Sequence, residues 1–365
     1  MKILCDRQQL QEAFTVVGGI PPLKTPKPVI QSVLMDATAD GVTLYATDLE
    51  ISAKVPVDAV KVSEPGRTLL PARETSALLR ELSDPTLTLS GQEGRTTIDA
   101  GTGSFVLVSN DPSQFPAEPE FKQGVEVELP VRDFLEMIRR TSFAAAREET
   151  RYAINGLLLE LKDGCARLVG TDGRRLALCY TEHTGDPQNS RVVIPIRALQ
   201  ALTKAVADDS VEPLKISISS NQIRFALDGT ELISQLLDNR FPEYEQVIPK
   251  AAESTIEIER EPLEKNLRRV AILSSGEVRM VRFKFEGTEV KLSAESSGIG
   301  RADLSMGIEL TGPGGGISFN PDFLLDALKV SDRELVRIDM TDDSTPAKFT
   351  LGDSYTYILM PISGS

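Results

Sequence analysis

Two aspartates that follow alternating apolar segments are the first candidates for chemistry in this chain. Asp48 lies in GVTLYATDLE and Asp172 in CARLVGTDGR, 124 residues later, and a threonine precedes each of them. Carboxylates at strand ends often bind metal ions or act as general acids. A Thr-Asp pair can instead close a turn, because its side-chain oxygens bond nearby backbone N–H groups. A third copy of the stretch, AESSGIG, carries Glu295 and Ser296 at this place, which favours the turn.

Few other residues could support catalysis or bind a cofactor. His183 is the only histidine, which excludes a His-dependent nucleophile and a site with several His ligands. Cys5, Cys165 and Cys179 form no Cys-x-x-Cys pair, so they indicate buried reduced thiols. The stretch GPGGGIS at 312–318 lacks the Lys-Ser/Thr ending of a phosphate-binding loop and indicates a turn. We expect no catalytic residue, no metal and no cofactor; an enzyme with a site between domains is the alternative.

Composition narrows the class of protein further. The chain has 365 residues, is 41% hydrophobic and carries a net charge of -14. It has no apolar run of the roughly 18 to 20 residues that cross a bilayer, and its start becomes polar too soon for a signal peptide. We therefore expect a cytoplasmic protein without membrane contact. The acidic balance argues against a protein that coats nucleic acid by bulk electrostatics.

The 124-residue interval belongs to a threefold internal repeat. Each third opens with a strand and an amphipathic helix, and its later half repeats a strand and a helix, as in TLLPARETSALLREL, VVIPIRALQALTKAV and GISFNPDFLLDALKV. Short alternating segments with turn residues lie between them. The chain is therefore predicted to be α+β, with three copies of a two-helix, antiparallel-sheet unit. The expected domains are 1–124, 125–253 and 254–365, with helices at 6–17, 72–82, 131–147, 196–206, 260–272 and 321–329.

Six motifs, in order, carry a resemblance to a known family. ATDLE, LLPAR, RYAINGLLLE, GTDGRRLAL, DNRFPEYEQVIP and RRVAILS together resemble the bacterial DNA sliding clamp, the beta subunit of the replicative DNA polymerase. The similarity spans the whole chain. It implies a non-enzymatic processivity factor, a head-to-tail homodimer whose six domains form a ring around double-stranded DNA. It also implies that replicative polymerase, clamp loader and repair polymerases bind through short linear peptides. A repeat scaffold that binds proteins without encircling DNA is the alternative.

The charge distribution suits a ring that holds DNA by enclosure. The six expected helices contain 14 Lys or Arg and 10 Asp or Glu, a net charge of +4 within a chain of -14. A few screened phosphate contacts suffice for an enclosing ring, and more would oppose sliding. Guided partly by the resemblance, we expect DNA contacts from Lys24, Arg73, Arg139, Arg140, Arg147, Arg151, Tyr152 and Arg197.

The resemblance also implies a peptide pocket between the second and third domains. An extended peptide with apolar anchors suits a groove of aliphatic side chains. Carried over position by position, the pocket comprises Ile154, Thr171, Gly173, Arg175, Leu176, Pro242, Val247, Asn320, Phe323, Ser344, Met360, Pro361 and Ile362.

The seam of the implied ring would join the first domain of one chain to the third domain of the other. Phe105 and Leu107 alternate on SFVLVS, and Ile272 and Leu273 end a third-copy helix. We expect these four side chains to form the apolar centre of the dimer interface. Packing inside each domain is the alternative for them.

Overall fold

The computed structural model describes residues 1–362 apart from 93, 102, 123, 147–154, 186–188, 207–209, 239–240, 275–278 and 297. Within these residues six α-helices form, one at each expected place. Their bounds are α1 Arg7–Val17, α2 Ala72–Glu81, α3 Val131–Thr141, α4 Ile196–Ala205, α5 Arg260–Ala271 and α6 Pro321–Lys329. Four short 3-10 helices are η1 Pro28–Gln31, η2 Pro112–Gln114, η3 Ser142–Ala144 and η4 Tyr244–Val247.

The chain folds as two compact units. Unit 1 comprises residues 1–135, 183–188 and 194–238, and unit 2 comprises residues 136–182, 189–193 and 239–365. Their border falls within α3 and within one strand of the second repeat, so the units do not follow the repeat borders. The reason is that sheets in both units continue across the sequence repeats.

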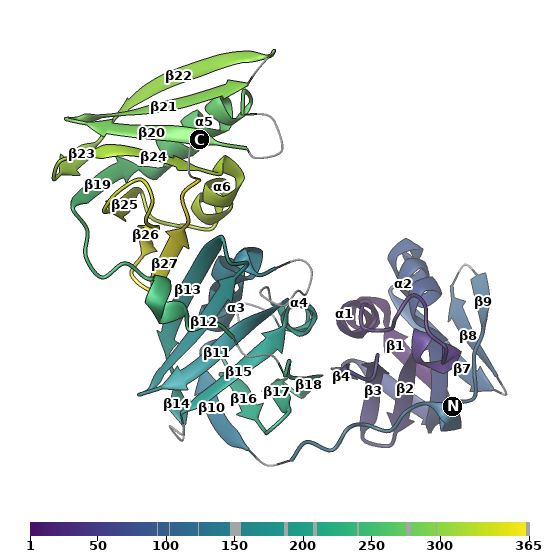
Figure 1. Ribbon diagram of the computed structural model, residues 1–365. Coiled ribbons are helices and arrows are strands. Elements are labelled where there is room, and N and C mark those ends of the chain that lie inside the picture. Colours follow the sequence, from purple (N-terminus) through teal and green to yellow (C-terminus); the bar gives the residue numbers. More distant parts are fainter. Residues whose placement is uncertain are drawn as a thin grey trace. The chain divides into compact units, whose positions relative to one another are not determined.

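Unit 1 contains a five-stranded and a nine-stranded sheet (Figure 1). The five-stranded sheet has the order β5 Val60–Glu64, β1 Lys2–Asp6, β7 Thr86–Gln92, β8 Arg95–Ala100, β9 Gly103–Val108. The nine-stranded sheet has the order β14 Thr184–Gly185, β10 Val125–Leu129, β16 Leu214–Ile218, β17 Gln222–Leu227, β18 Thr230–Gln235, β4 Ile51–Val57, β3 Gly41–Thr47, β2 Ser32–Thr38, β6 Gly66–Pro71.

Unit 2 contains a nine-stranded and a four-stranded sheet. The larger has the order β15 Ser190–Pro195, β11 Gly156–Lys162, β12 Cys165–Thr171, β13 Arg175–Glu182, β27 Tyr355–Leu359, β26 Ala347–Gly352, β25 Leu335–Met340, β19 Ser254–Glu259, β23 Glu309–Thr311. The smaller has the order β22 Gly300–Gly307, β21 Glu289–Ser296, β20 Val281–Glu286, β24 Gly315–Phe319. The described strand pairs in all four sheets are antiparallel, as the sequence predicted.

The helices begin where the sequence places capping residues. Asp6 accepts a hydrogen bond from the Gln9 backbone at the start of α1, and Asn320 accepts one from the Asp322 backbone at the start of α6. Pro71 and Pro195 end β6 and β15, and α2 and α4 start immediately after them. The repeated proline therefore marks the switch from strand to helix.

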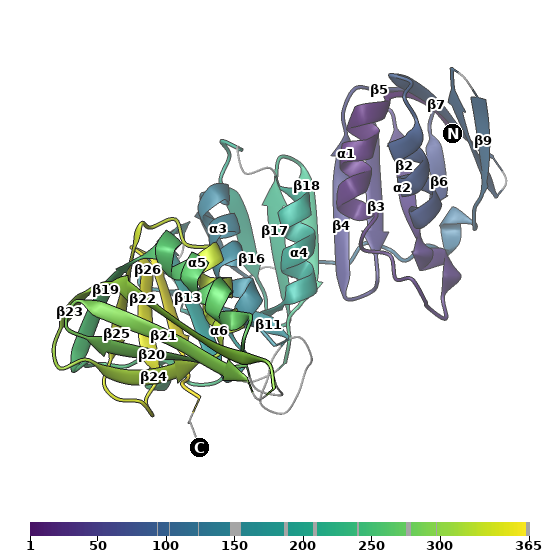
Figure 2. The same cartoon turned by 90° about the horizontal axis from the view of Figure 1, so that it is seen from above.

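The helices α1, α2, α4, α5 and α6 pack against the sheets. In unit 1, α1 packs on β3 and β4, α2 on β2 and β6, and α4 on β18 and α1 (Figure 2). In unit 2, α5 packs on β19 to β22 and contacts α6, which packs on β27. A row of buried aromatic rings, Phe283, Phe319, Phe349 and Tyr357, fills the core beside α6. No helix among the described residues combines the length and apolar character that a membrane span requires.

Candidate functional site

The two Thr-Asp pairs form turns of the same design, one in each unit. The hydroxyls of Thr47 and Thr171 each accept a hydrogen bond from the backbone two residues on and donate one to the carbonyl four residues on. Asp48 Oδ1 accepts from the backbone N–H groups two and three residues on, at 3.0 and 2.7 Å, and Asp172 Oδ1 accepts from the same two positions at 3.0 and 3.1 Å. The prediction of capped turns is therefore confirmed. Within the described residues, no three His, Cys, Asp or Glu side chains group as metal ligands.

Arg175 anchors the turn of unit 2 to two other elements. Its side chain is only 9% exposed, and it donates to Asp172 Oδ2 at 3.0 Å, Asp326 Oδ2 at 2.7 Å and the Phe143 carbonyl at 2.7 Å. Its guanidinium carbon lies 4.3 Å from the ring centre of Phe323 and 5.4 Å from that of Phe143. The arginine thus joins the β12–β13 turn, η3 and α6, and its donors are used inside the protein.

The chain after β27 lies beside the same turn. Met360 donates its backbone N–H to the Arg174 carbonyl at 3.0 Å, and Ile362 donates to the Ser318 carbonyl at 2.8 Å. Tyr357 is buried, which raises the pKa of its phenol, and the hydroxyl donates to the Phe323 carbonyl at 2.8 Å. These contacts bring the predicted residues of the turn, α6 and the end of β27 together in unit 2.

The remaining predicted pocket residues are held by neighbours of their own. Pro242 and Val247 are exposed on the segment around η4, which Tyr244 fixes by donating to Glu160 at 3.0 Å. Ser344 bonds Asp342 within its own turn, and no contact described for it reaches the β12–β13 turn. Ile154 lies outside the described residues. Leu176 is 3% exposed, whereas Val247 and Met360 are 44% and 41% exposed, so the latter two offer apolar surface.

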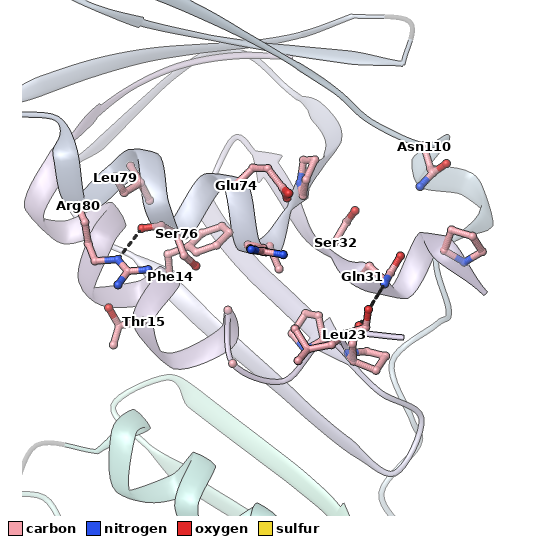
Figure 3. A pocket seen from close by; sticks show the side chains of 18 of the residues that line it. Phe14, Thr15, Leu23, Gln31, Ser32, Glu74, Ser76, Leu79, Arg80 and Asn110 are labelled. Carbon is pink, nitrogen blue, oxygen red and sulfur yellow. Dashed lines mark hydrogen bonds between the residues drawn. The ribbon is translucent and has the colours of Figure 1, made fainter. Parts of the chain in front are cut away.

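Lys24 and Arg73 line a pocket of about 900 Å³ in unit 1 (Figure 3). The pocket lies between α1, the proline-rich loop that follows it, and α2. Figure 3 shows Arg80 bonded to the Ser76 carbonyl on one wall, while Gln31 donates to the Leu23 carbonyl on the other. Both predicted DNA contacts are exposed at this pocket.

The other described arginines predicted to contact DNA are all paired with carboxylates. Arg197 is 57% exposed and its Nη2 lies 2.8 Å from Asp48 Oδ2. Arg139 is 47% exposed and donates to Glu136. Arg140 is buried, with Nε 2.5 Å from Glu136 and Nη2 3.1 Å from Asp332. The guanidinium of Arg140 therefore already has two carboxylate partners, and its contact with DNA stays a prediction. Arg147, Arg151 and Tyr152 lie outside the described residues.

The four residues predicted at the dimer seam keep apolar surface. Phe105 is 37% exposed on β9, which is an edge strand of the five-stranded sheet, and Leu107 is half-buried there. Ile272 is 74% exposed just after α5, and Leu273 is half-buried. Val106 and Val108 add exposed apolar surface on the same edge strand.

Sequence reasoning missed two partners of the Thr-Asp turns. Asp326 and Phe143 lie 151 and 32 residues from Arg175, and only the folded chain brings them to its guanidinium. No spacing rule connects such distant positions. Asp48 and Arg197 each belong to a stretch that recurs at the 124-residue interval, but the repeat does not say that the two residues meet.

Comparison with known proteins places the chain in a family. Three family models, for the N-terminal, central and C-terminal domains of the DNA polymerase III beta subunit, match residues 1–119, 128–243 and 245–363. The beta sliding clamp of Chlamydia pneumoniae is 33% identical over 364 residues, which cover 99% of both chains. The chain belongs to the beta sliding clamp family. Sliding clamps of this family are processivity factors of DNA replication and are not enzymes.

Solved sliding clamp structures share the whole fold. The DNA polymerase III beta subunit of Thermotoga maritima superposes with a TM-score of 0.94 over all of both chains at 24% identity. The sliding clamp of Pseudomonas aeruginosa, in a structure with bound griselimycin, superposes with a TM-score of 0.93 over all of both chains at 27% identity. The α+β fold with antiparallel sheets predicted from the repeat is therefore confirmed.

Proposed function

We propose that two copies of this chain close head to tail into a six-domain ring around duplex DNA, in the cytoplasm. The ring tethers replicative polymerase, clamp loader and repair polymerases through short linear peptides. Each copy contributes three domains, 1–124, 125–253 and 254–365, and the three family-model matches, at 1–119, 128–243 and 245–363, support a division into three. The acidic chain with its more basic helices fits a ring that retains DNA by enclosure.

The observation that carries this proposal is an unmatched pair of strands. β18 is the last strand of the second repeat, and it pairs with β4, the strand that follows the first Thr-Asp turn. β27 is the last strand of the third repeat, and it pairs with β13, the strand that follows the second Thr-Asp turn. The closing strand of the first repeat, β9, and the strand after the third turn, β22, are both sheet edges. An exposed edge is a template for pairing with another chain. Pairing β9 of one copy with β22 of another completes the pattern twice in a closed dimer.

The register of this seam follows from the pairs inside the chain. Ala53 of β4 lies opposite Leu232 of β18. The repeat aligns Ala302 with Ala53, because both pair with the alanine before their turn. It aligns Phe105 with Leu232, because each is the third residue of its strand and pairs with a buried residue of the preceding strand, Ile98 or Phe225. We therefore expect Phe105 of one copy to face Ala302 of the other.

A disulfide tests this register directly. Opposed residues of antiparallel strands lie about 4.5 to 5.5 Å apart at their Cα atoms, which suits a disulfide. The Phe105→Cys, Ala302→Cys double variant should oxidise to a covalent dimer on a non-reducing gel. Phe105→Cys with Ser305→Cys, three residues out of register, is the matched control. Equal crosslinking of both variants contradicts the register, and a monomeric wild-type protein in sedimentation at low micromolar concentration contradicts the dimer.

DNA topology tests the enclosure. Clamp that a loader and ATP have placed on nicked circular DNA should survive a salt wash and leave once the circle is linearised. A scaffold that does not encircle DNA would be retained equally on both forms. The double variant Ile272→Ala, Leu273→Ala should be a folded monomer that fails to stay on circles, whereas Val211→Ala, at another exposed apolar residue, should behave as wild type.

Val247 tests the peptide site. Val247→Ala removes two methyl groups and should cost about 1 to 1.6 kcal/mol of binding free energy through lost burial. This corresponds to a roughly 5- to 15-fold larger dissociation constant for the peptide. Fluorescence polarisation with a labelled polymerase-derived peptide measures this change. Leu335→Ala, at a comparably exposed residue that begins β25, is the control and should leave the affinity unchanged. Unchanged affinity in both variants would place the peptide elsewhere.

A further inference from the structure

Arg197 and Asp48 form an ion pair between a fixed carboxylate and a movable cation. Asp48 is held by two backbone N–H groups through Oδ1, and its side chain is 5% exposed. Arg197 is 57% exposed on the first turn of α4, and its Nη2 approaches Asp48 Oδ2 to 2.8 Å without the alignment of a hydrogen bond. The aspartate therefore cannot leave the pair without breaking its turn, whereas the guanidinium can swing away into solvent.

The same helix position in the first repeat lacks this restraint. Arg73 stands 124 residues before Arg197, on the first turn of α2. Among the described residues, no ion pair joins Arg73 to a carboxylate, and its side chain is exposed at the pocket of unit 1. The two helices α2 and α4 thus present the same cation in two states, one open and one tethered.

We propose that Asp48 is a positioning residue that restrains Arg197 and so limits its contact with DNA phosphates. A carboxylate and a phosphate oxygen compete for the same guanidinium, and the carboxylate is already in place. In a ring that slides, each cation that grips a phosphate adds an electrostatic contact that must break before the next step. The tether keeps the lining basic enough to attract the duplex while it reduces this grip. The inference rests on the proposed enclosure of DNA by the helices.

Unit 2 contains a second pair of this kind. Arg139 is 47% exposed near the end of α3 and donates Nε to Glu136 at 2.6 Å. Its Nη2 also donates to the Val330 carbonyl at 2.9 Å. Two exposed arginines predicted to face DNA are therefore each partly neutralised by a carboxylate of the same unit. This arrangement lowers the effective positive charge of the helices below the value that a residue count suggests.

The salt dependence of DNA binding tests the proposal. Asp48→Asn keeps Oδ1 as the acceptor for the turn but removes the charge that faces Arg197. In equilibrium titrations of the full-length protein with a labelled linear duplex, log K should fall more steeply with log salt, by about 0.9 for each guanidinium that reaches a phosphate. Affinity would then fall about 3.5-fold further than that of wild type between 50 and 200 mM salt. One-dimensional diffusion on nicked circles should also slow.

A double variant separates this tether from a general change of charge. Asp48→Asn combined with Arg197→Ala should show the slope of Arg197→Ala alone, because no guanidinium is left to release. Glu64→Gln, an equal charge change on the exposed strand β5, is the matched control and should leave the slope unchanged. The proposal is overturned if Asp48→Asn still steepens the salt dependence when Arg197 is absent, or if Asp48→Asn alone leaves the slope unchanged.

Two further measurements keep the result interpretable. Thermal unfolding should show that Asp48→Asn retains the turn; if it does not, Asp48→Ser still offers an oxygen acceptor and replaces it in the same titrations. Retention of wild type on circular over linear DNA is measured in parallel. Loss of that preference contradicts the proposed ring, whereas an intact preference with an unchanged slope contradicts only the tether.

Discussion

The two Thr-Asp turns share their backbone hydrogen bonds but are held by different arginines. In unit 1 the arginine comes from α4, is more than half exposed and meets a single carboxylate. In unit 2 Arg175 comes from the turn itself, is buried and bonds two carboxylates and a carbonyl between two aromatic rings. One turn therefore presents a movable cation, and the other is fixed as part of a rigid scaffold.

The residue after the aspartate differs in a related way. Gly173 has a φ of 83°, where glycine carries no steric penalty, but Leu49 has a φ of 81° at the matching position and is 51% exposed. The same backbone shape is thus made once without strain and once with a side chain that disfavours it. Local sequence sets the shape of each turn, and its surroundings decide the use.

The largest difference in stability between the two turns should appear when the arginine of each is replaced by alanine. Arg175→Ala leaves Asp172, whose side chain is only 19% exposed, without its cation, and it should destabilise unit 2 by about 3 kcal/mol, at the low end for a buried pair because Asp326 is half exposed. Arg197→Ala removes a pair with an exposed cation and should cost less than about 1 kcal/mol. Hydrogen exchange of the β12–β13 and β3–β4 amides measures each effect locally. Similar costs at both turns would show that burial does not distinguish them.

Exchange of the residue after each aspartate should give a smaller effect. Gly173→Ala meets no atom within 4 Å of its new Cβ, so its cost is backbone strain alone, about 1 to 2 kcal/mol. Leu49→Gly relieves that strain but loosens the unfolded chain, so the net gain should stay below about 1 kcal/mol. Thermal or chemical unfolding, followed for each unit, measures the sign of the change in unfolding free energy for both variants. Destabilisation by Leu49→Gly would show that the leucine side chain has a packing role.

Low pH should weaken the ion pairs that Glu136 of α3 forms with Arg139 and Arg140. Burial raises the pKa of Glu136, but hydrogen bonds and charge from Arg139 and Arg140 outweigh it and bring the pKa below its usual 4.5. Because the folded pKa is the lower one, this contribution is present above about pH 4.5 and is lost as pH falls through the folded value. Since Arg139 is exposed, we expect less than about 1 kcal/mol. Glu136→Gln should reduce the loss of unfolding free energy of unit 2 as the pH falls. An unchanged dependence on pH would show that Glu136 does not contribute to it.

The repeated elements could be predicted well because their signals are local. Helical periodicity placed α1 to α6 within a few residues, except that the helix expected over 131–147 ends at Thr141 and continues as η3. The Thr-Asp turns depend on hydrogen bonds within four residues. Arg140 shows the limit, because helix spacing alone did not reveal that Asp332 and Glu136 would enclose its guanidinium.

The sequence by itself determined the threefold repeat, the α+β class, the caps and turns, and the likeness to sliding clamps. Each of these depends on residue types and spacings within a short segment or on a match over the whole chain. Only the tertiary structure decided which arginine meets which carboxylate. Arg175 is tied to Asp326 and Arg197 to Asp48 across about 150 residues each, and such pairs depend on how sheets continue from one repeat into the next. Burial and exposure follow from that packing, and they make one arginine structural and leave the other free to move.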